Sequence, residues 1–146
     1  RGQAQAIALN LREMTSIGVP IIAIIIGEGG SGGALGIGIA DKVCVLENAY
    51  YSVISPEGCA AILWKNGSKA PEAAEVLKLT GPDLLKMGII DEIVPEPLGG
   101  AHTGPQRMGE ILKETINKNL QELIPLKKDE LLKLRYKKFR GMGAIG

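Results

Sequence analysis

The chain has 146 residues and a formal net charge of +1 at pH 7, and 45% of its residues are hydrophobic but only 3% are aromatic. This length allows one domain with a buried core. The near-neutral charge argues against recruitment of DNA or an acidic membrane by a global electric field, and the scarcity of aromatic residues argues against stacking on single-stranded nucleic acid. We therefore expect no specific nucleic-acid site.

The first third of the chain predicts alternating helices and strands. Apolar residues recur at helical spacing over residues 3–16, which predicts an amphipathic helix. Residues 19–26 predict a strand that is apolar on both faces, as in parallel sheets. Small residues predict a short helix over residues 31–40, and β-forming residues predict strands over residues 43–47 and 50–54.

The remainder of the chain predicts mostly helix. Ser55 and Pro56 have the pattern of an N-cap and first helical residue, for a helix that ends near Trp64. Further helices are expected over residues 71–79 and 82–87, a strand over 90–94, a turn-rich loop over 95–104, and two amphipathic helices over 105–139 that break near Pro125. The predicted fold class is therefore α/β.

Two other features of the sequence favour structural interpretations. Basic residues cluster at Lys127, Lys128 and residues 133–140, next to Asp129 and Glu130, and we interpret them as a solvated helix face or subunit contact. The spacing of Cys44 and Cys59 fits no zinc motif, which favours reduced thiols in the core. The apolar stretch over residues 17–40 is interrupted by proline, glutamate and glycines, so we expect no membrane span.

The most informative segment is residues 27–38, in which seven of twelve residues are glycine. A buried strand that leads into glycines and then a helix directs backbone N–H groups at an anion. Gly27-x-Gly29-x-x-Gly32, with Glu47 twenty residues beyond Gly27, matches a dinucleotide-binding fingerprint. The short helix and the strand-turn-strand after it disfavour that interpretation. A nucleotide-binding (Rossmann-type) module and a purely structural, close-packed helix stay open as alternatives.

The order of elements around these glycines resembles the crotonase superfamily, which processes acyl-coenzyme A thioesters. The resemblance rests on the strand over residues 21–26, Gly32-Gly33 at the helix start, Asp41 at the helix end and the strand over 43–46. It implies that a backbone N–H at Gly32 stabilises an oxyanion. Leu35 stands where hydratases carry a catalytic glutamate, so this resemblance does not imply hydration of an enoyl thioester.

Four longer blocks resemble the alpha-subunit family of acetyl-coenzyme A carboxylase carboxyltransferase. They cover residues 26–35, 55–65, 69–75 and 93–102. This resemblance implies a partial crotonase-like core, of the ClpP/crotonase ββα-spiral type, with C-terminal helices. We expect residues 1–104 to form the C-terminal part of the crotonase-like domain and residues 105–146 to form a helical extension. We also expect the chain to be the C-terminal part of a longer subunit and to be inactive alone.

The resemblance further implies transfer of carboxylate from carboxybiotin to acetyl-coenzyme A, which gives malonyl-coenzyme A for fatty-acid synthesis. Gly32 and Gly33 would stabilise the oxyanion on the ureido oxygen of biotin. This would place no metal in the chain, and it implies a location in the bacterial cytoplasm or the plastid stroma. The implied partners are a zinc-ribbon beta subunit in an alpha2beta2 assembly, biotin carboxyl carrier protein and biotin carboxylase.

Further residues are candidates for contacts with biotin or coenzyme A, and each has a structural alternative. Glu57 is mainly a first-turn helix residue that interacts with the dipole, Lys65 could meet a coenzyme A phosphate, and His102 could make either a structural hydrogen bond or a ligand contact. A lone histidine cannot build a metal site. Glu28 is interpreted as facing solvent or an interface, or as ordering the loop. The glycine-loop candidates are Gly29, Gly30 and Ser31.

Overall fold

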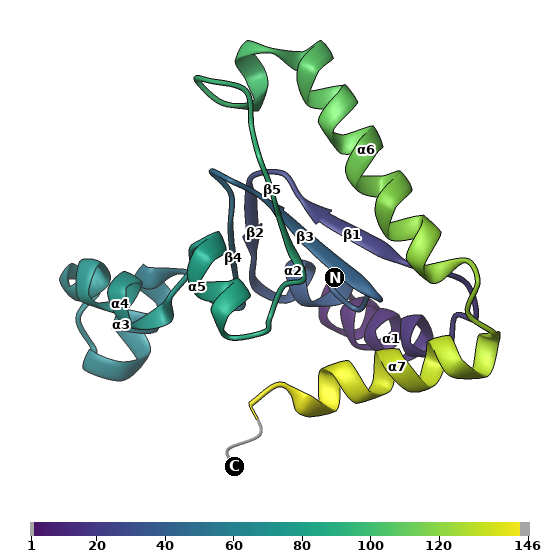
Figure 1. Ribbon diagram of the computed structural model, residues 1–146. Helices are drawn as coiled ribbons and strands as arrows, with labels where there is room; N and C mark the ends of the chain where they lie inside the picture. Colours follow the sequence, from purple (N-terminus) through teal and green to yellow (C-terminus); the bar gives the residue numbers. More distant parts are fainter. Residues whose placement is uncertain (1, 144–146) are drawn as a thin grey trace.

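Two small parallel sheets form the centre of the computed structural model, which describes residues 2–143 (Figure 1). In the first sheet, β1 (Ile22–Ile25), β3 (Lys42–Leu46) and β5 (Glu92–Val94) lie side by side in the order β1-β3-β5. In the second sheet, β2 (Glu28–Gly30) pairs with β4 (Tyr50–Ser52). Every strand pair in these two sheets is parallel, so each sheet joins strands that are distant along the chain.

The chain winds through these sheets in successive ββα units. The first unit is β1, β2 and α2 (Ser31–Ile37), and the second is β3, β4 and α3 (Pro56–Trp64). This succession is the ββα spiral expected from the resemblance. One local expectation is wrong: Glu28–Gly30 is a strand rather than loop, because its backbone pairs with Tyr50–Ser52.

The remaining helices surround this spiral. Helices α4 (Ala70–Leu77) and α5 (Gly81–Lys86) follow α3, and a one-turn 3₁₀ helix over Gly67–Lys69 precedes α4. α3 and α4 pack on each other and form an arm that projects from the sheets (Figure 1). The arm begins as predicted, with the Ser55 hydroxyl accepting a hydrogen bond from the Gly58 N–H at 3.1 Å. The other helices are α1 (Gln3–Thr15), α6 (Pro105–Leu123) and α7 (Lys128–Gly141).

The core lies on both faces of β3, the middle strand. Val43, Cys44, Val45 and Leu46 are all buried. Strand β1 is less buried than predicted, since Ala23 is its one fully buried residue. The reason is its position: within residues 2–143, β1 has β3 on one side and no strand on the other.

A buried ion pair joins α7 to the start of the first sheet. The Arg135 side chain is 1% exposed and that of Asp41 is 4% exposed, and the guanidinium donates to both carboxylate oxygens at 2.9 and 2.7 Å. Arg135 also donates to three main-chain carbonyls, that of Met14 at the end of α1 and those of Ile17 and Val19 between α1 and β1. The Asp41 carboxylate accepts the Ile21 N–H at 2.8 Å, so both charges are fully hydrogen-bonded.

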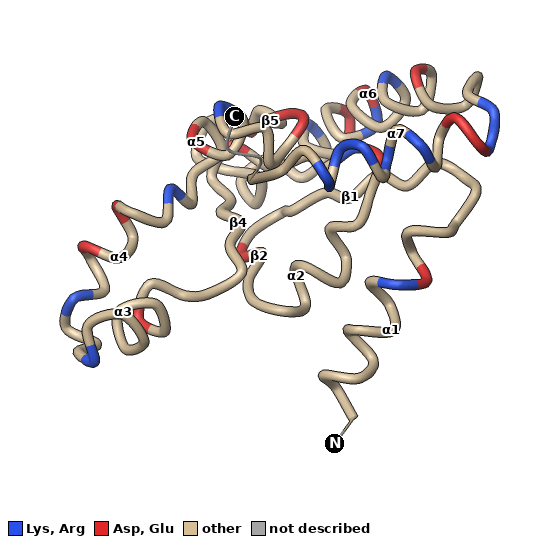
Figure 2. Tube along the Cα trace, turned by 90° about the horizontal axis from the view of Figure 1, so that it is seen from below, with Lys and Arg blue, Asp and Glu red and all other residues tan. Residues whose placement is uncertain are grey.

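The same arrangement recurs one strand further along the sheet. Asp91 precedes β5, accepts the Val43 N–H at 2.7 Å, and forms an ion pair with Lys138, one turn of α7 beyond Arg135. The basic cluster on α7 (Figure 2) is therefore not wholly a solvated face: Arg135 is buried and Lys138 is mostly buried, because each neutralises an aspartate. Lys133 and Arg140 are exposed, as predicted.

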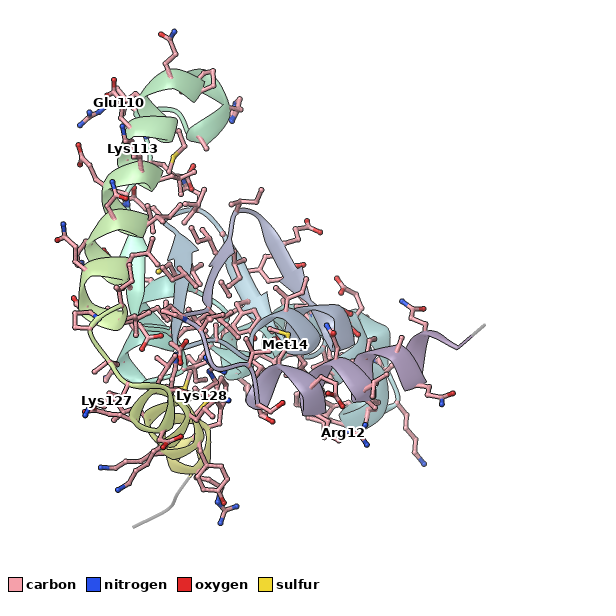
Figure 3. The ribbon with its side chains drawn as sticks, turned by 90° about the vertical axis from the view of Figure 1, so that its right-hand side faces the viewer. Arg12, Met14, Glu110, Lys113, Lys127 and Lys128 are labelled. Carbon is pink, nitrogen blue, oxygen red and sulfur yellow. The ribbon has the colours of Figure 1, made fainter. Side chains whose placement is uncertain are left out.

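Helices α1 and α6 complete this end of the molecule. Met14 at the end of α1 and Lys128 at the start of α7 lie on neighbouring elements (Figure 3). A Cβ on Gly18 would lie 2.7–2.8 Å from the Lys128 aliphatic stem, so a larger residue there would displace the Lys128 side chain. On α6, Lys118 pairs with Glu92 at 2.7 Å and Glu122 pairs with Lys42 at 2.6 Å.

Removing the Arg135 guanidinium should destabilise the whole fold. In Arg135→Ala the Asp41 charge stays buried without a partner, and we expect the free energy of unfolding to fall by about 3–5 kcal/mol. Urea denaturation measures this as a lower midpoint at an unchanged m-value. Lys133→Ala, on the exposed side of the same helix, is the matched control and should change stability by less than about 0.5 kcal/mol. Equal effects of the two variants would contradict this account of the pair.

Candidate functional site

A cleft of about 410 Å³ lies between the β1–β2 segment and one face of α2. Residues 23–30 form one wall, and Gly33, Ala34, Ile37 and Gly38 form the other. The cleft thus begins where β1 runs into the glycine segment, at the carboxyl edge of the first sheet. Ligands bind at this edge in many parallel α/β proteins.

Backbone geometry at the start of α2 is unusual. Gly30 is extended, with φ −122° and ψ 154°, and Ser31 has φ 59°, in the left-handed region that non-glycine residues seldom adopt. Such strain persists only where the surrounding structure enforces it, and it is concentrated at functional sites. The first N–H groups of a helix have no partner within the helix, so the first turn of α2, which includes the cleft-lining Gly33, carries such donors.

The glycines of α2 divide into two sets by what their α-carbons face. A Cβ on Gly32 would lie 3.3 Å from the Ile7 Cδ1, and a Cβ on Gly36 would lie 3.6 Å from the Ile7 Cγ2. These two positions allow α1 to approach α2, which is the close packing kept open as an alternative above. A Cβ on Gly33 would meet nothing within 4 Å, and Gly33 lines the cleft. One helix therefore has a face that packs against α1 and a face that lines the cleft.

Tyr51 holds the segment around the cleft in place. A Cβ on Gly38 would clash with the Tyr51 hydroxyl oxygen, and one on Gly29 would lie 3.0 Å from the Tyr51 ring and 2.9 Å from Ile25. The Tyr51 hydroxyl donates to the Ala34 carbonyl at 3.3 Å, and burial raises the pKa of this phenol. Sequence reasoning missed Tyr51, since its aromatic ring in a β-forming run predicts only a strand.

The structure brings together some of the predicted site residues and separates others. Gly29, Gly30 and Gly33 line the cleft, with Ser31 and Gly32 in the same segment. Glu57 and Lys65 are exposed at the two ends of α3, on the arm, and do not line it. Lys65 has φ 53° because it terminates that helix.

His102 lies in a second, shallower hollow at the ends of β3 and β5. It is exposed on a one-turn 3₁₀ helix, Ala101–Thr103, and shares the hollow with Glu47 and Glu96. Hydrogen bonds from the backbone N–H groups of Asn48 and Ala101 to Glu96 lower the pKa of that carboxyl. Glu47, the acidic residue of the dinucleotide-binding fingerprint, accepts the Glu96 N–H at 3.2 Å. It therefore orders the turn that contains Glu96.

Side-chain nucleophiles and metal ligands do not gather at the cleft. Over residues 2–143, no group of three or more His, Cys, Asp or Glu side chains is placed to hold a metal ion. Over the same residues, no helix combines the length and apolar character needed to cross a membrane. Both cysteines are free and buried, as predicted. The chemistry that this cleft can offer is hydrogen bonding from backbone N–H groups, beside one carboxylate, Glu28.

Solved structures with the same fold define the class. A Pseudomonas malonate decarboxylase hetero-dimer superposes with a TM-score of 0.71 at 16% identity, over 94% of this chain and 55% of that chain. The transcarboxylase 12S hexamer with hydrolysed methylmalonyl-coenzyme A superposes with a TM-score of 0.63 at 18% identity, over 83% of this chain and 22% of that chain. The protein therefore has a partial crotonase-type fold, as predicted.

Sequence comparison then identifies the family. Residues 1–143 match the family described as acetyl co-enzyme A carboxylase carboxyltransferase-like, and the chain belongs to it. Acetyl-coenzyme A carboxylase carboxyl transferase subunit alpha of Prochlorococcus marinus MIT 9313 is 56% identical over 99% of this chain and 44% of its own length. The same subunit from strain MIT 9215 is 59% identical over 98% and 43%. The chain thus spans less than half the length of these relatives.

Cys44 provides a test of the buried core next to the site. Burial raises the pKa of its thiol from the ordinary 9.0 to about 11, with smaller contributions from Glu92 and Asp91. The unfolded thiol ionises first, so this stabilisation is complete below pH 9 and is lost as the pH rises towards 11. Between pH 9 and pH 11 we therefore expect the free energy of unfolding of the wild type to fall. In the Cys44→Ala variant, which has no thiol to ionise, the fall should be smaller by about 1–2 kcal/mol.

Alkylation provides a second measurement on the same thiol. At pH 8 roughly one Cys44 in a thousand is thiolate, so iodoacetamide should label it only after unfolding. Mass spectrometry of the labelled peptide detects the difference. Rapid labelling of the folded protein at Cys44 would contradict the buried, protonated thiol.

Proposed function

We propose that the chain contributes the biotin-facing half of a carboxyltransferase site, which transfers carboxylate from carboxybiotin to acetyl-coenzyme A to form malonyl-coenzyme A in fatty-acid biosynthesis. The observation that carries the proposal is a glycine-lined cleft at the start of α2 in a chain of this family. The relatives' names supply the reaction class. In this proposal residues 1–104 are the C-terminal part of the crotonase-like carboxyltransferase domain and residues 105–146 are a helical extension.

The backbone donors of the cleft supply the catalytic chemistry in this proposal. As the N–CO₂ bond of carboxybiotin breaks, CO₂ leaves and negative charge develops on the ureido group. N–H groups at Gly32 and Gly33 stabilise that charge, and one preorganised donor of this kind contributes about 3–4 kcal/mol. The ureido nitrogen then takes a proton from the acetyl methyl group, and the resulting enolate carbon adds to CO₂. Every proton and electron pair is balanced without a side-chain base.

Partners follow from the same proposal. The curated relatives are named as alpha subunits, and the malonate decarboxylase neighbour is a hetero-dimer. We propose a beta subunit with a zinc ribbon in an alpha2beta2 assembly, biotin carboxyl carrier protein as the donor of carboxybiotin, and biotin carboxylase upstream. The proposed location is the cytoplasm or plastid stroma. In this proposal, a partner that covers the arm brings coenzyme A or the carrier into contact with Glu57 and Lys65. A partner that covers the second hollow does the same for His102.

The Gly33 position tests the role of the cleft. In Gly33→Ala the new methyl group enters open space beside the donors, so we expect biotin-dependent decarboxylation of malonyl-coenzyme A to fall at least about tenfold in the intact complex. Stability should not fall, because alanine favours a helix over glycine by about 1 kcal/mol.

Gly36→Ala is the matched control in the same helix. Its methyl group would make an ordinary 3.6 Å contact with Ile7 on the side that faces α1, so activity should be retained. Full activity in Gly33→Ala, or equal loss in both variants, would count against the proposed site.

A further inference from the structure

Glu28 is the one ionisable residue among those that line the cleft in the described chain. Its backbone is fixed, because β2 pairs in parallel with β4 in the register Glu28 to Tyr50. Side chains alternate along a strand, so Glu28 and Gly30 face the same side and Gly29 faces the other. A Cβ on Gly29 would clash with Ile25, whereas one on Gly30 would meet nothing within 4 Å. Glu28 therefore projects from the open side of β2.

The surroundings of Glu28 are apolar and uncharged. Strand β1 and helix α2 carry no charged residue, and Figure 2 shows one acidic stretch at β2, which connects them along the chain. Ile26 and Ile37, which also line the cleft, are 72% and 66% exposed. Within residues 2–143, the Glu28 carboxylate makes no hydrogen bond or ion pair, unlike Glu47, Glu92 and Glu96.

These groups are complementary to one kind of ligand. Backbone N–H donors suit a carbonyl oxygen, a carboxylate suits an N–H donor, and two exposed isoleucines suit an apolar ring or chain. A cyclic urea fused to an apolar ring offers all three, with an N–H beside its C=O. A simple anion offers neither an N–H donor nor an apolar part.

We propose that Glu28 accepts a hydrogen bond from the ring N–H of the cyclic urea that does not carry the carboxylate. This proposal rests on the proposed function and assigns a substrate contact within it. A hydrogen bond to an ionised acceptor is roughly twice as strong as a neutral one. The Glu28 charge also repels the transferable carboxylate, so it favours the ring orientation in which the carboxylated nitrogen faces away. Glu28 therefore binds and orients the urea while the N–H groups of α2 stabilise its oxygen.

Two substitutions at Glu28 test the contact in the intact complex of the full-length alpha chain and its beta subunit. The assay is malonyl-coenzyme A decarboxylation with free biotin as the varied substrate. We expect E28A to raise the KM for biotin at least about tenfold and to leave the KM for malonyl-coenzyme A unchanged. E28Q keeps an oxygen acceptor without the charge and should have a smaller effect. E75Q, at an exposed position on the arm, is the control for loss of one negative charge.

A biotin analogue that is methylated on the non-carboxylated ring nitrogen separates this contact from a structural effect. The wild-type complex should use the analogue at least about tenfold less well than biotin, and E28A should discriminate much less between the two. An unchanged biotin KM in E28A, an undiminished penalty for methylation, or an effect confined to malonyl-coenzyme A or to subunit assembly would overturn the proposal. The last result would instead indicate an ion pair with a partner. A wild-type complex without biotin-dependent turnover would overturn the proposed function itself, which is a distinct result.

Discussion

The buried pair of Arg135 and Asp41 holds the fold together at the amino ends of the parallel strands. Five hydrogen bonds from one guanidinium connect α7 to Asp41 and to carbonyls at the end of α1 and in the segment that leads to β1. The Asp41 carboxylate in turn holds the Ile21 N–H, just before β1. Removing either partner is strongly destabilising, because the remaining charge stays buried where water cannot solvate it. The pair therefore fixes where β1 and β3 start relative to each other.

Asp91 and Lys138 repeat this constraint for the next strand. Each aspartate comes just before one strand of the first sheet and accepts an N–H near the start of the neighbouring strand, and each meets a cation from α7. The residue after each aspartate, Lys42 or Glu92, pairs with α6. Helices from the end of the chain thus set the register of strands from its beginning. The carboxyl ends of the strands are left free for a site.

The ion pairs that hold the fold together lie at the amino edge of the sheet, and the cleft lies at its carboxyl edge. This separation suits a site that is built from backbone groups. At the carboxyl edge the important groups are N–H donors, whose direction depends on the main chain and not on a rotamer. Tyr51 packs against Gly29 and Gly38 and holds the main chain on both sides of the cleft. Between Gly29 and Gly38, Ser31 has the left-handed backbone conformation that is concentrated at functional sites. Such a site needs few titratable groups, and among residues 2–143 Glu28 is the one that lines it.

The sequence by itself determined the local elements and the family. Helical spacing predicted α1, α6 and α7, Ser55 and Pro56 predicted the start of α3, and four blocks of residues indicated the family later matched over residues 1–143. Only the tertiary structure decided that Arg135 and Lys138 turn inward, that Glu28–Gly30 pairs as a strand, and that Gly32 faces α1 while Gly33 lines the cleft. The reason is distance along the chain. Periodicity and capping act within a few residues, whereas Arg135 meets a partner 94 residues away, and a glycine's sequence neighbours do not show what lies opposite its α-carbon.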